Sequence, residues 1–111
     1  MKFHDTDIER LLLQSSSNLL KGPLTPLRVA LLEKFGPMEK AFIVDWIPEQ
    51  GEDIYTIVIN RDAIIVLEIS RHEPTALEFE IKTVRAYFAE NPRIGKDTRR
   101  KIEAAVRLFA K

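Results

Sequence analysis

Apolar residues follow two different periods along this chain. Near the N-terminus they recur every three or four positions, over residues 8–20 and again over 27–32, which is typical of amphipathic helices. From residue 41 onward, runs rich in β-branched and aromatic residues occupy 41–47, 54–59 and 63–69, which predicts strands. The breaks between these runs are short, so consecutive strands are expected to pair antiparallel. The pattern predicts an α+β fold in which helices pack against an antiparallel meander.

Start and stop signals bound the two N-terminal helices. Thr6–Glu9 has the spacing of a capping box, and Gly22–Pro23 ends the first helix. The polar run Ser15–Asn18 is poor helix material, which predicts fraying after Gln14. Thr25–Pro26 is a cap followed by a proline at the first helical position, and Gly36 stops the second helix.

The segment after the third strand satisfies two patterns at once. Apolar and charged residues alternate from residue 77, which favours a strand, whereas apolar residues at spacings of three and four continue to residue 88, which favours a helix. We expect a short fourth strand over Leu77–Ile81 and then a helix over about 83–90. Asp97 or Thr98 is expected to cap a last amphipathic helix that also packs on the sheet.

The length and composition predict one domain. The chain has 111 residues, the usual size of a single domain, so we expect one α+β unit over 1–111. It is 45% hydrophobic and 31% charged, which is typical of a folded globule. The longest apolar run, Ala63–Leu67, is far shorter than a membrane helix, and the first residues do not resemble a secretory signal. Cysteine is absent, which excludes disulfides and thiol nucleophiles. We therefore expect a cytoplasmic protein with no membrane partner.

Charge is segregated although the net charge is zero. Residues 45–90 contain ten acidic and four basic side chains, whereas residues 91–111 contain seven basic and two acidic ones. Such segregation creates complementary patches that steer charged partners. The basic members near the C-terminus suggest an alternative function in nucleic-acid binding, although no aromatic residue alternates with them as a base-stacking surface would require. These residues are Lys96, Arg99, Arg100, Lys101 and Arg107.

The acidic segment contains the candidate binding residues. Residues 49–53 are expected to form a turn whose carboxylates belong to Glu49, Glu52 and Asp53, flanked by Trp46 and Tyr55. The commoner role for these two aromatic residues is burial in the core. The alternative makes them anchors of a protein interface, with the three carboxylates as its charged rim.

Catalytic and ligand-binding patterns are weak. The two histidines, His4 and His72, are far apart and lack metal-ligand spacing. The serines lack the context of an exposed nucleophile, and the four glycines do not form a phosphate-binding loop. A small enzyme that uses Glu52, Asp53 or His72 as an acid or base is a third alternative. We expect no enzyme activity, no cofactor and no metal.

Three segments carry a resemblance to a known class of proteins. Trp46–Tyr55 (WIPEQGEDIY), Glu68–Arg71 (EISR) and Arg99–Ala105 (RRKIEAA) resemble small bacterial immunity proteins that are encoded beside the toxins of contact-dependent growth inhibition systems. The resemblance implies a cytoplasmic, non-enzymatic protein that binds one cognate toxin domain, often a nuclease, and blocks its active site or substrate surface. The leading hypothesis is therefore a toxin-neutralising protein, and the alternative is a nucleic-acid-binding regulator that uses the basic C-terminal helix.

Overall fold

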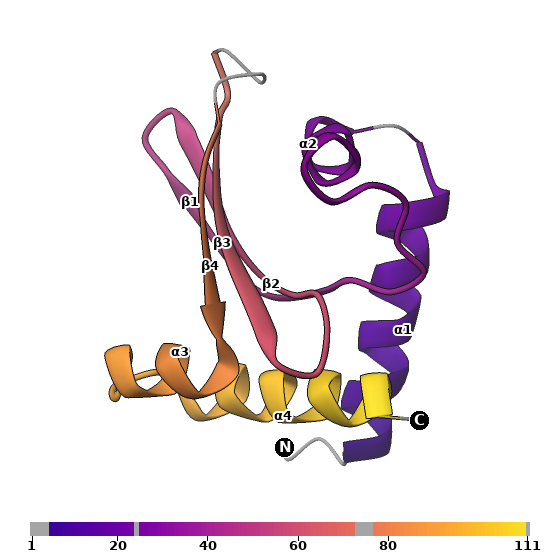
Figure 1. The fold of residues 1–111 in the computed structure, drawn as a ribbon, viewed down its shortest axis with the longest axis vertical. Coiled ribbons are helices and arrows are strands. Elements are labelled where there is room, and N and C mark those ends of the chain that lie inside the picture. Colours follow the sequence, from indigo (N-terminus) through magenta and orange to yellow (C-terminus); the bar gives the residue numbers. More distant parts are fainter. Residues whose placement is uncertain (1–4, 24, 73–76, 111) are drawn as a thin grey trace.

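The computed structural model describes residues 5–23, 25–72 and 77–110, and these form an α+β unit. Its elements are α1 (Asp5–Lys21), α2 (Pro26–Phe35), β1 (Phe42–Glu49), β2 (Glu52–Val58), β3 (Ala63–Ser70), β4 (Leu77–Thr83), α3 (Val84–Glu90) and α4 (Lys96–Ala110). The strands form one antiparallel sheet in the order β1-β2-β3-β4. The predicted meander with two N-terminal helices and C-terminal helices against the sheet is confirmed (Figure 1).

The first helix differs from the prediction in two places. Helix α1 continues without a break to Lys21, so the expected fraying after Gln14 is wrong. Ser16 is buried, and its Oγ accepts a hydrogen bond from the backbone N–H of Ala41 at 3.1 Å. Ser16, which the sequence pattern marks as unfavourable in a helix, thus stays helical and forms a hydrogen bond with the segment that precedes β1. Thr6 lies inside α1 and does not cap it.

The ambiguous segment forms a strand and then a helix, as expected. Thr83 ends β4 and caps α3, because its side chain accepts a hydrogen bond from the backbone N–H of Ala86 at 3.0 Å. Helix α4 begins at Lys96, so Asp97 and Thr98 both lie in its first turn and the prediction that one of them caps the helix is wrong. The carboxylate of Asp97 is favourable there, since the N-terminus of a helix is partially positive.

The connection between β1 and β2 is tighter than predicted. The strands continue through Pro48 and pair as far as Glu49 with Glu52, so the expected five-residue turn is wrong and only Gln50 and Gly51 remain between them. Pro48 is tolerated because β1 is an edge strand and needs no further partner. Gly51 adopts a φ of +81°, a conformation that glycine accepts without a steric penalty.

The helices cover the two faces of the sheet unequally. Helix α2 packs on one face through Leu27 and Leu31, against strand residues that include Ile65 and Leu67. Helices α3 and α4 cross one end of the opposite face, where Ile102 joins a cluster formed with α1. Figure 1 shows the remainder of that second face free of helices. Within the described residues, this is the part of the sheet that the fold leaves bare.

Candidate functional site

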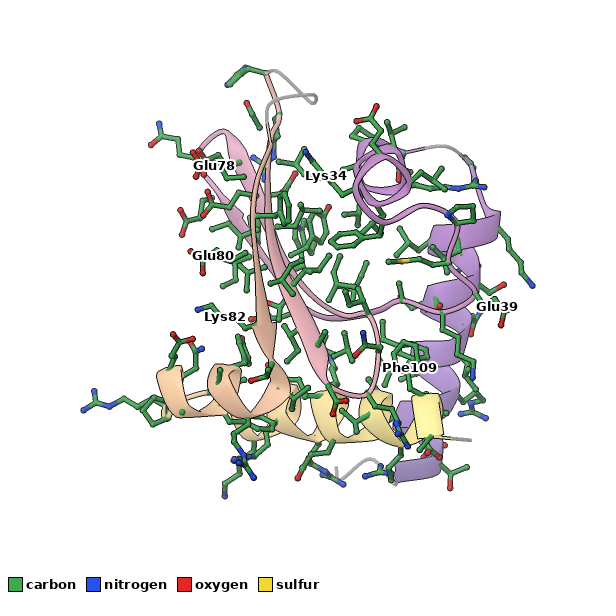
Figure 2. All side chains as sticks on the ribbon, in the orientation of Figure 1. Lys34, Glu39, Glu78, Glu80, Lys82 and Phe109 are labelled. Carbon is green, nitrogen blue, oxygen red and sulfur yellow. The ribbon has the colours of Figure 1, made fainter. Side chains whose placement is uncertain are left out.

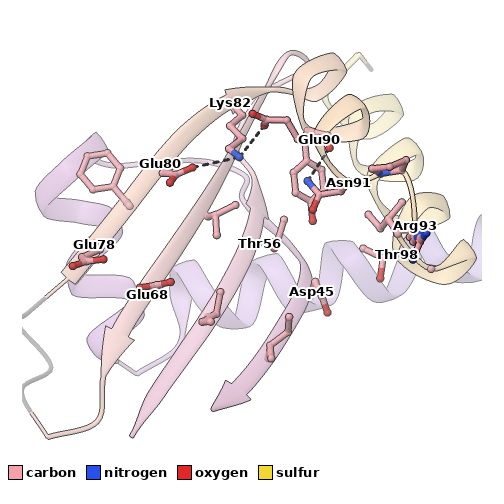
Figure 3. Close-up of a pocket in the computed structure, with 18 residues that line it drawn as sticks. Asp45, Thr56, Glu68, Glu78, Glu80, Lys82, Glu90, Asn91, Arg93 and Thr98 are labelled. Atoms are coloured by element: carbon pink, nitrogen blue, oxygen red, sulfur yellow. Dashed lines mark hydrogen bonds and ion pairs between the residues drawn. The ribbon is translucent and has the colours of Figure 1, made fainter. Parts of the chain in front are cut away.

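The bare face of the sheet is the floor of a broad groove with a volume of about 1070 Å³, which we call the acidic groove (Figure 3). One wall is the connection between α3 and α4. The charged residues that line the groove are Asp45, Glu68, Glu78, Glu80, Lys82, Glu90 and Arg93. The lining of the groove therefore contains five carboxylates and two cations. Figure 2 shows Glu78, Glu80 and Lys82 on the side of β4 that faces away from α2 and its Lys34.

The strand register explains why these side chains share one face. Side chains alternate between the two faces of a sheet, and residues paired across strands point the same way. Asp45 pairs with Thr56, Thr56 with Val66, and Val66 with Glu80, so all four project from the bare face. The sheet also contributes apolar side chains to the floor, of which Ile47 is 45% exposed. The floor of the groove thus combines apolar and acidic side chains.

Two carboxylates lie directly opposite each other in the groove. Glu68 on β3 pairs with Glu78 on β4. Partial burial raises the pKa of Glu68, and the negative charges of Glu52, Glu78 and Glu49 and a hydrogen bond with Glu78 raise it further. Like charges at directly opposed positions destabilise a sheet. This arrangement therefore works against the stability of the isolated chain.

The cation on β4 is already neutralised within the chain. Lys82 Nζ lies 2.8 Å from Glu90 Oε2 and 3.3 Å from Glu80 Oε2, and hydrogen bonding to Glu90 is the main reason that the pKa of Lys82 is raised. No cation in the described part of the chain forms an ion pair with Glu68 or Glu78. The acidic charge near these two residues is therefore available to a partner.

The opposite face of the β1–β2 hairpin carries a different cluster. Trp46 stacks on Tyr55 with ring centroids 6.4 Å apart and an interplanar angle of 14°. Its indole N–H donates to Asp53 Oδ1 at 3.1 Å, and the guanidinium of Arg71 donates to both oxygens of Asp53 at 2.8 and 3.2 Å. The hydrogen bonds from Arg71 and then from Trp46 hold the pKa of Asp53 below its ordinary value. Trp46 is 54% exposed, so its expected burial in the core is wrong.

The structure divides the five predicted binding residues between the two faces. Trp46, Asp53 and Tyr55 share the face that α2 covers, and Asp53 and Tyr55 border a smaller hollow of about 520 Å³ there. Burial raises the pKa of Tyr55, and the charge of Asp53 adds to the effect. Glu49 and Glu52 pair with each other and point toward the acidic groove, where both act on Glu68. The division follows from the length of the turn between β1 and β2. Successive side chains of a strand point to opposite faces, so a turn one residue longer or shorter would move each side chain of β2 to the other face of the sheet.

Sequence reasoning missed most of the groove. The carboxylates on β3 and β4 were not proposed as binding residues, yet they provide its centre. A signal was present, because Glu78 and Glu80 alternate with Phe79 and Ile81, and alternation of this kind places the charged residues on one face. Their proximity to Glu68 depends on the pairing of β3 with β4, which is a long-range feature.

The basic residues of the C-terminal helix lie outside the groove. Helix α4 buries Ile102 and Leu108 and leaves Lys96 and Lys101 exposed. The guanidinium of Arg99 lies over the ring of Phe88, 4.3 Å from its centroid. Arg107 Nε lies 3.8 Å from Glu9 Oε1 on α1. Both arginines, which the sequence offered as phosphate-binding residues, thus make contacts within the chain.

Other candidate chemistry has little geometric support in the described residues. No group of three or more histidine, aspartate or glutamate side chains there could hold a metal ion. The backbone N–H of His72 donates to Ser70 Oγ at 3.2 Å, and its ring lies beside Gly51. Its proposed orienting partner, Glu73, lies outside the described residues.

Comparisons with known proteins found no relative. No protein-family model matches the chain, and neither the curated proteins nor the solved structures contain a match. None of the helices described is both long and apolar enough to cross a membrane.

Proposed function

We propose that this protein is a binding module that neutralises a cognate toxin domain by direct contact between its acidic groove and a basic surface of the toxin. The observation that carries the proposal is the composition of the groove, whose lining combines five carboxylates and two cations with apolar side chains of the sheet. Apolar contacts supply affinity in such an interface, and charge complementarity supplies the rate of encounter and the choice of partner.

The opposed pair Glu68 and Glu78 supports this proposal in physical terms. The two carboxylates repel each other across the strands, because they lie at directly opposed positions, Glu68 is partly removed from solvent, and neither has an ion-pair partner among the described residues. A lysine or arginine of a partner placed between them would remove that repulsion on binding. Toxin domains that cleave nucleic acids present cations for phosphate recognition, so they offer side chains of the required charge.

Trp46 provides a second supporting feature, on the other face of the β1–β2 hairpin. The side chain is 54% exposed, yet stacking on Tyr55 and a hydrogen bond to Asp53 hold it in place. A rigid, exposed aromatic residue loses little conformational entropy on binding, which is why such residues are enriched among interface anchors. Glu49 and Glu52 close the same hairpin at its end.

The first experiment is co-expression. The C-terminal domain of the protein encoded immediately upstream is induced in a susceptible host, alone and together with this protein, and growth is recorded. The proposal predicts arrest by the domain alone and rescue by this protein. A harmless domain, or arrest that is not relieved, contradicts the immunity function and makes salt-dependent nucleic-acid binding by α4 the next property to measure.

A matched pair of variants then tests the surface. Glu68→Lys combined with Glu78→Lys reverses the charge at the centre of the groove and should abolish rescue and binding. The control, Glu33→Lys combined with Glu103→Lys, makes the same change of charge at exposed positions on α2 and α4. Loss of rescue in the control as well, or retained rescue in the groove variant, would remove the groove from the interface.

A further inference from the structure

The two edges of the sheet differ in whether another strand can pair with them. Strand β1 contains Pro48, which has no N–H, and its register with β2 is irregular between Ile43 and Asp45. Both features are known to block pairing at a sheet edge. Strand β4 forms the other edge and contains neither, and its pairing with β3 is regular from Leu77 to Thr83.

The outer edge of β4 has free backbone groups. The N–H of Val84 donates to the carbonyl of Asp62 at 2.9 Å, directly beyond the pair of Thr83 with Ala63. Because bonding alternates along an antiparallel strand, the even-numbered residues of β4 bond to β3, and residues 79 and 81 direct their N–H and C=O groups outward. The N–H of Thr83 also points outward, whereas its C=O belongs to the first turn of α3, which Thr83 caps. No strand in the described part of the chain adjoins this edge.

Two apolar side chains of β4 are exposed beside these outward-facing backbone groups. Ile81 is 55% exposed and Phe79 is 39% exposed. Phe79 is held by an edge-to-face contact with Phe35, with ring centroids 6.1 Å apart, and by Lys34 Nζ 5.3 Å from its ring centroid. A regular edge strand with exposed apolar side chains can pair with another chain, and its charged residues, Glu78, Glu80 and Lys82, then restrict which partner and register fit.

We propose that β4 pairs antiparallel with β4 of a second copy of this chain, about a two-fold axis at Ile81. In this register Glu80 lies opposite Lys82 of the second copy, and Lys82 lies opposite Glu80 of the second copy. Ile81 meets its own equivalent on the other face, and Phe79 lies opposite Thr83. Lys82 keeps its contacts with Glu80 and Glu90 of its own chain and gains the opposed Glu80 of the second copy as a further carboxylate neighbour. The strand is therefore complementary in charge to itself, which identifies a second copy as the partner that fits it.

Neighbouring registers fit less well. An axis at Glu80 would place the two copies of Glu80 directly opposite each other, and an axis at Phe79 would pair Glu78 with Glu80. Both place like charges at opposed positions, which is destabilising. Of these three registers, only the axis at Ile81 pairs opposite charges without opposing like ones. In that register both bare faces lie on the same side of one continuous sheet, so the two acidic grooves adjoin.

Charge exchange tests the partner and the register together. Sedimentation velocity over a wide concentration range should show a monomer–dimer equilibrium for the unaltered chain. Glu80→Lys alone and Lys82→Glu alone should each weaken self-association by about tenfold or more, since each opposes like charges twice. An equimolar mixture of the two variants should recover it, because every opposed pair of charges in the mixed dimer then combines a lysine with a glutamate. A monomeric unaltered chain, or a mixture no stronger than its components, overturns the proposal.

A crosslinking experiment gives a second readout that does not depend on charge. The chain has no cysteine, so Ile81→Cys introduces a single thiol per copy. Hydrogen-bonded antiparallel partners have Cα atoms about 5.5 Å apart, which suits a disulfide, so this variant should form a covalent dimer on mild oxidation. In the control, Phe79→Cys, the two thiols lie four residues apart along the strands, at about 13 Å, and should not crosslink. Absent crosslinking at residue 81, or equal crosslinking of both variants, contradicts the register. Neither experiment involves a toxin, so the dimer and the proposed function stand or fall separately.

Discussion

Trp46 donates its indole N–H to Asp53 Oδ1 at 3.1 Å, on the same carboxylate that accepts two hydrogen bonds from Arg71. These donors lower the pKa of Asp53 below 3.8, so the folded state favours the charged carboxylate. The stabilisation is complete above pH 3.8 and is lost as the pH falls through the lowered pKa. Trp46 is the only tryptophan, and its fluorescence reports this site directly.

We therefore expect an acid transition in Trp46 fluorescence with a midpoint below 3.8. Asp53→Asn should remove that transition, because the amide does not titrate. Far-UV circular dichroism recorded in parallel separates local titration from acid unfolding. A midpoint at or above 3.8, or the same transition in the asparagine variant, would show that Asp53 does not hold Trp46 as described.

Glu68 has the opposite shift, and its removal should stabilise the fold. Its pKa lies above 4.5, mainly because of partial burial and then because of nearby carboxylates. The charged form is thus disfavoured in the folded state, and this penalty is present above the raised pKa and disappears as the pH falls below 4.5. Glu68→Gln should raise Tm at neutral pH and leave it unchanged well below pH 4.5, as measured by thermal denaturation. The control, Glu33→Gln on the exposed side of α2, should not change Tm at either pH.

Phe42 and Trp46 should differ strongly in their contribution to stability. Phe42 is fully buried and makes an edge-to-face contact with Phe109, with ring centroids 5.1 Å apart, so Phe42→Ala should lower the free energy of unfolding by about 3–5 kcal/mol. Trp46→Ala should lower it by only about 1 kcal/mol, since the loss is confined to an exposed stack on Tyr55 and one exposed hydrogen bond to Asp53. Urea denaturation followed by circular dichroism compares them, and similar losses would mean that Trp46 belongs to the core.

Two adjacent serines in α1 form a matched pair for hydrogen bonding. Ser16→Ala leaves the buried N–H of Ala41 without its acceptor, so it should destabilise the protein by about 1–3 kcal/mol. Ser17 is exposed in the same helix, and Ser17→Ala should change the free energy of unfolding by less than about 0.5 kcal/mol. Chemical denaturation measures both. Equal effects would indicate that helix propensity, and not the contact with Ala41, determines the outcome.

Local signals in the sequence predict most of the fold. Pro26 and Gly36 mark the ends of α2, because proline fixes its own φ at a helical value and glycine accepts the φ of +74° that follows the helix. The β-branched runs predict three strands, and alternation from residue 77 predicts the fourth. Short connections make consecutive strands pair, which is sufficient for the meander. Ser16 shows where local reasoning fails, since its partner is 25 positions away.

The candidate site depended on features that no local pattern contains. The sequence determined that carboxylates surround Trp46 and Tyr55, and it determined the period that alternates Glu78 and Glu80 with apolar residues. Only the tertiary structure decided that Glu49 and Glu52 point away from Asp53, through the length of one turn, and that Glu68 meets Glu78. It also decided which face of the sheet stays bare. The physical reason is that a strand's period specifies two faces without distinguishing them, and the packing of distant helices then buries one and leaves part of the other to solvent.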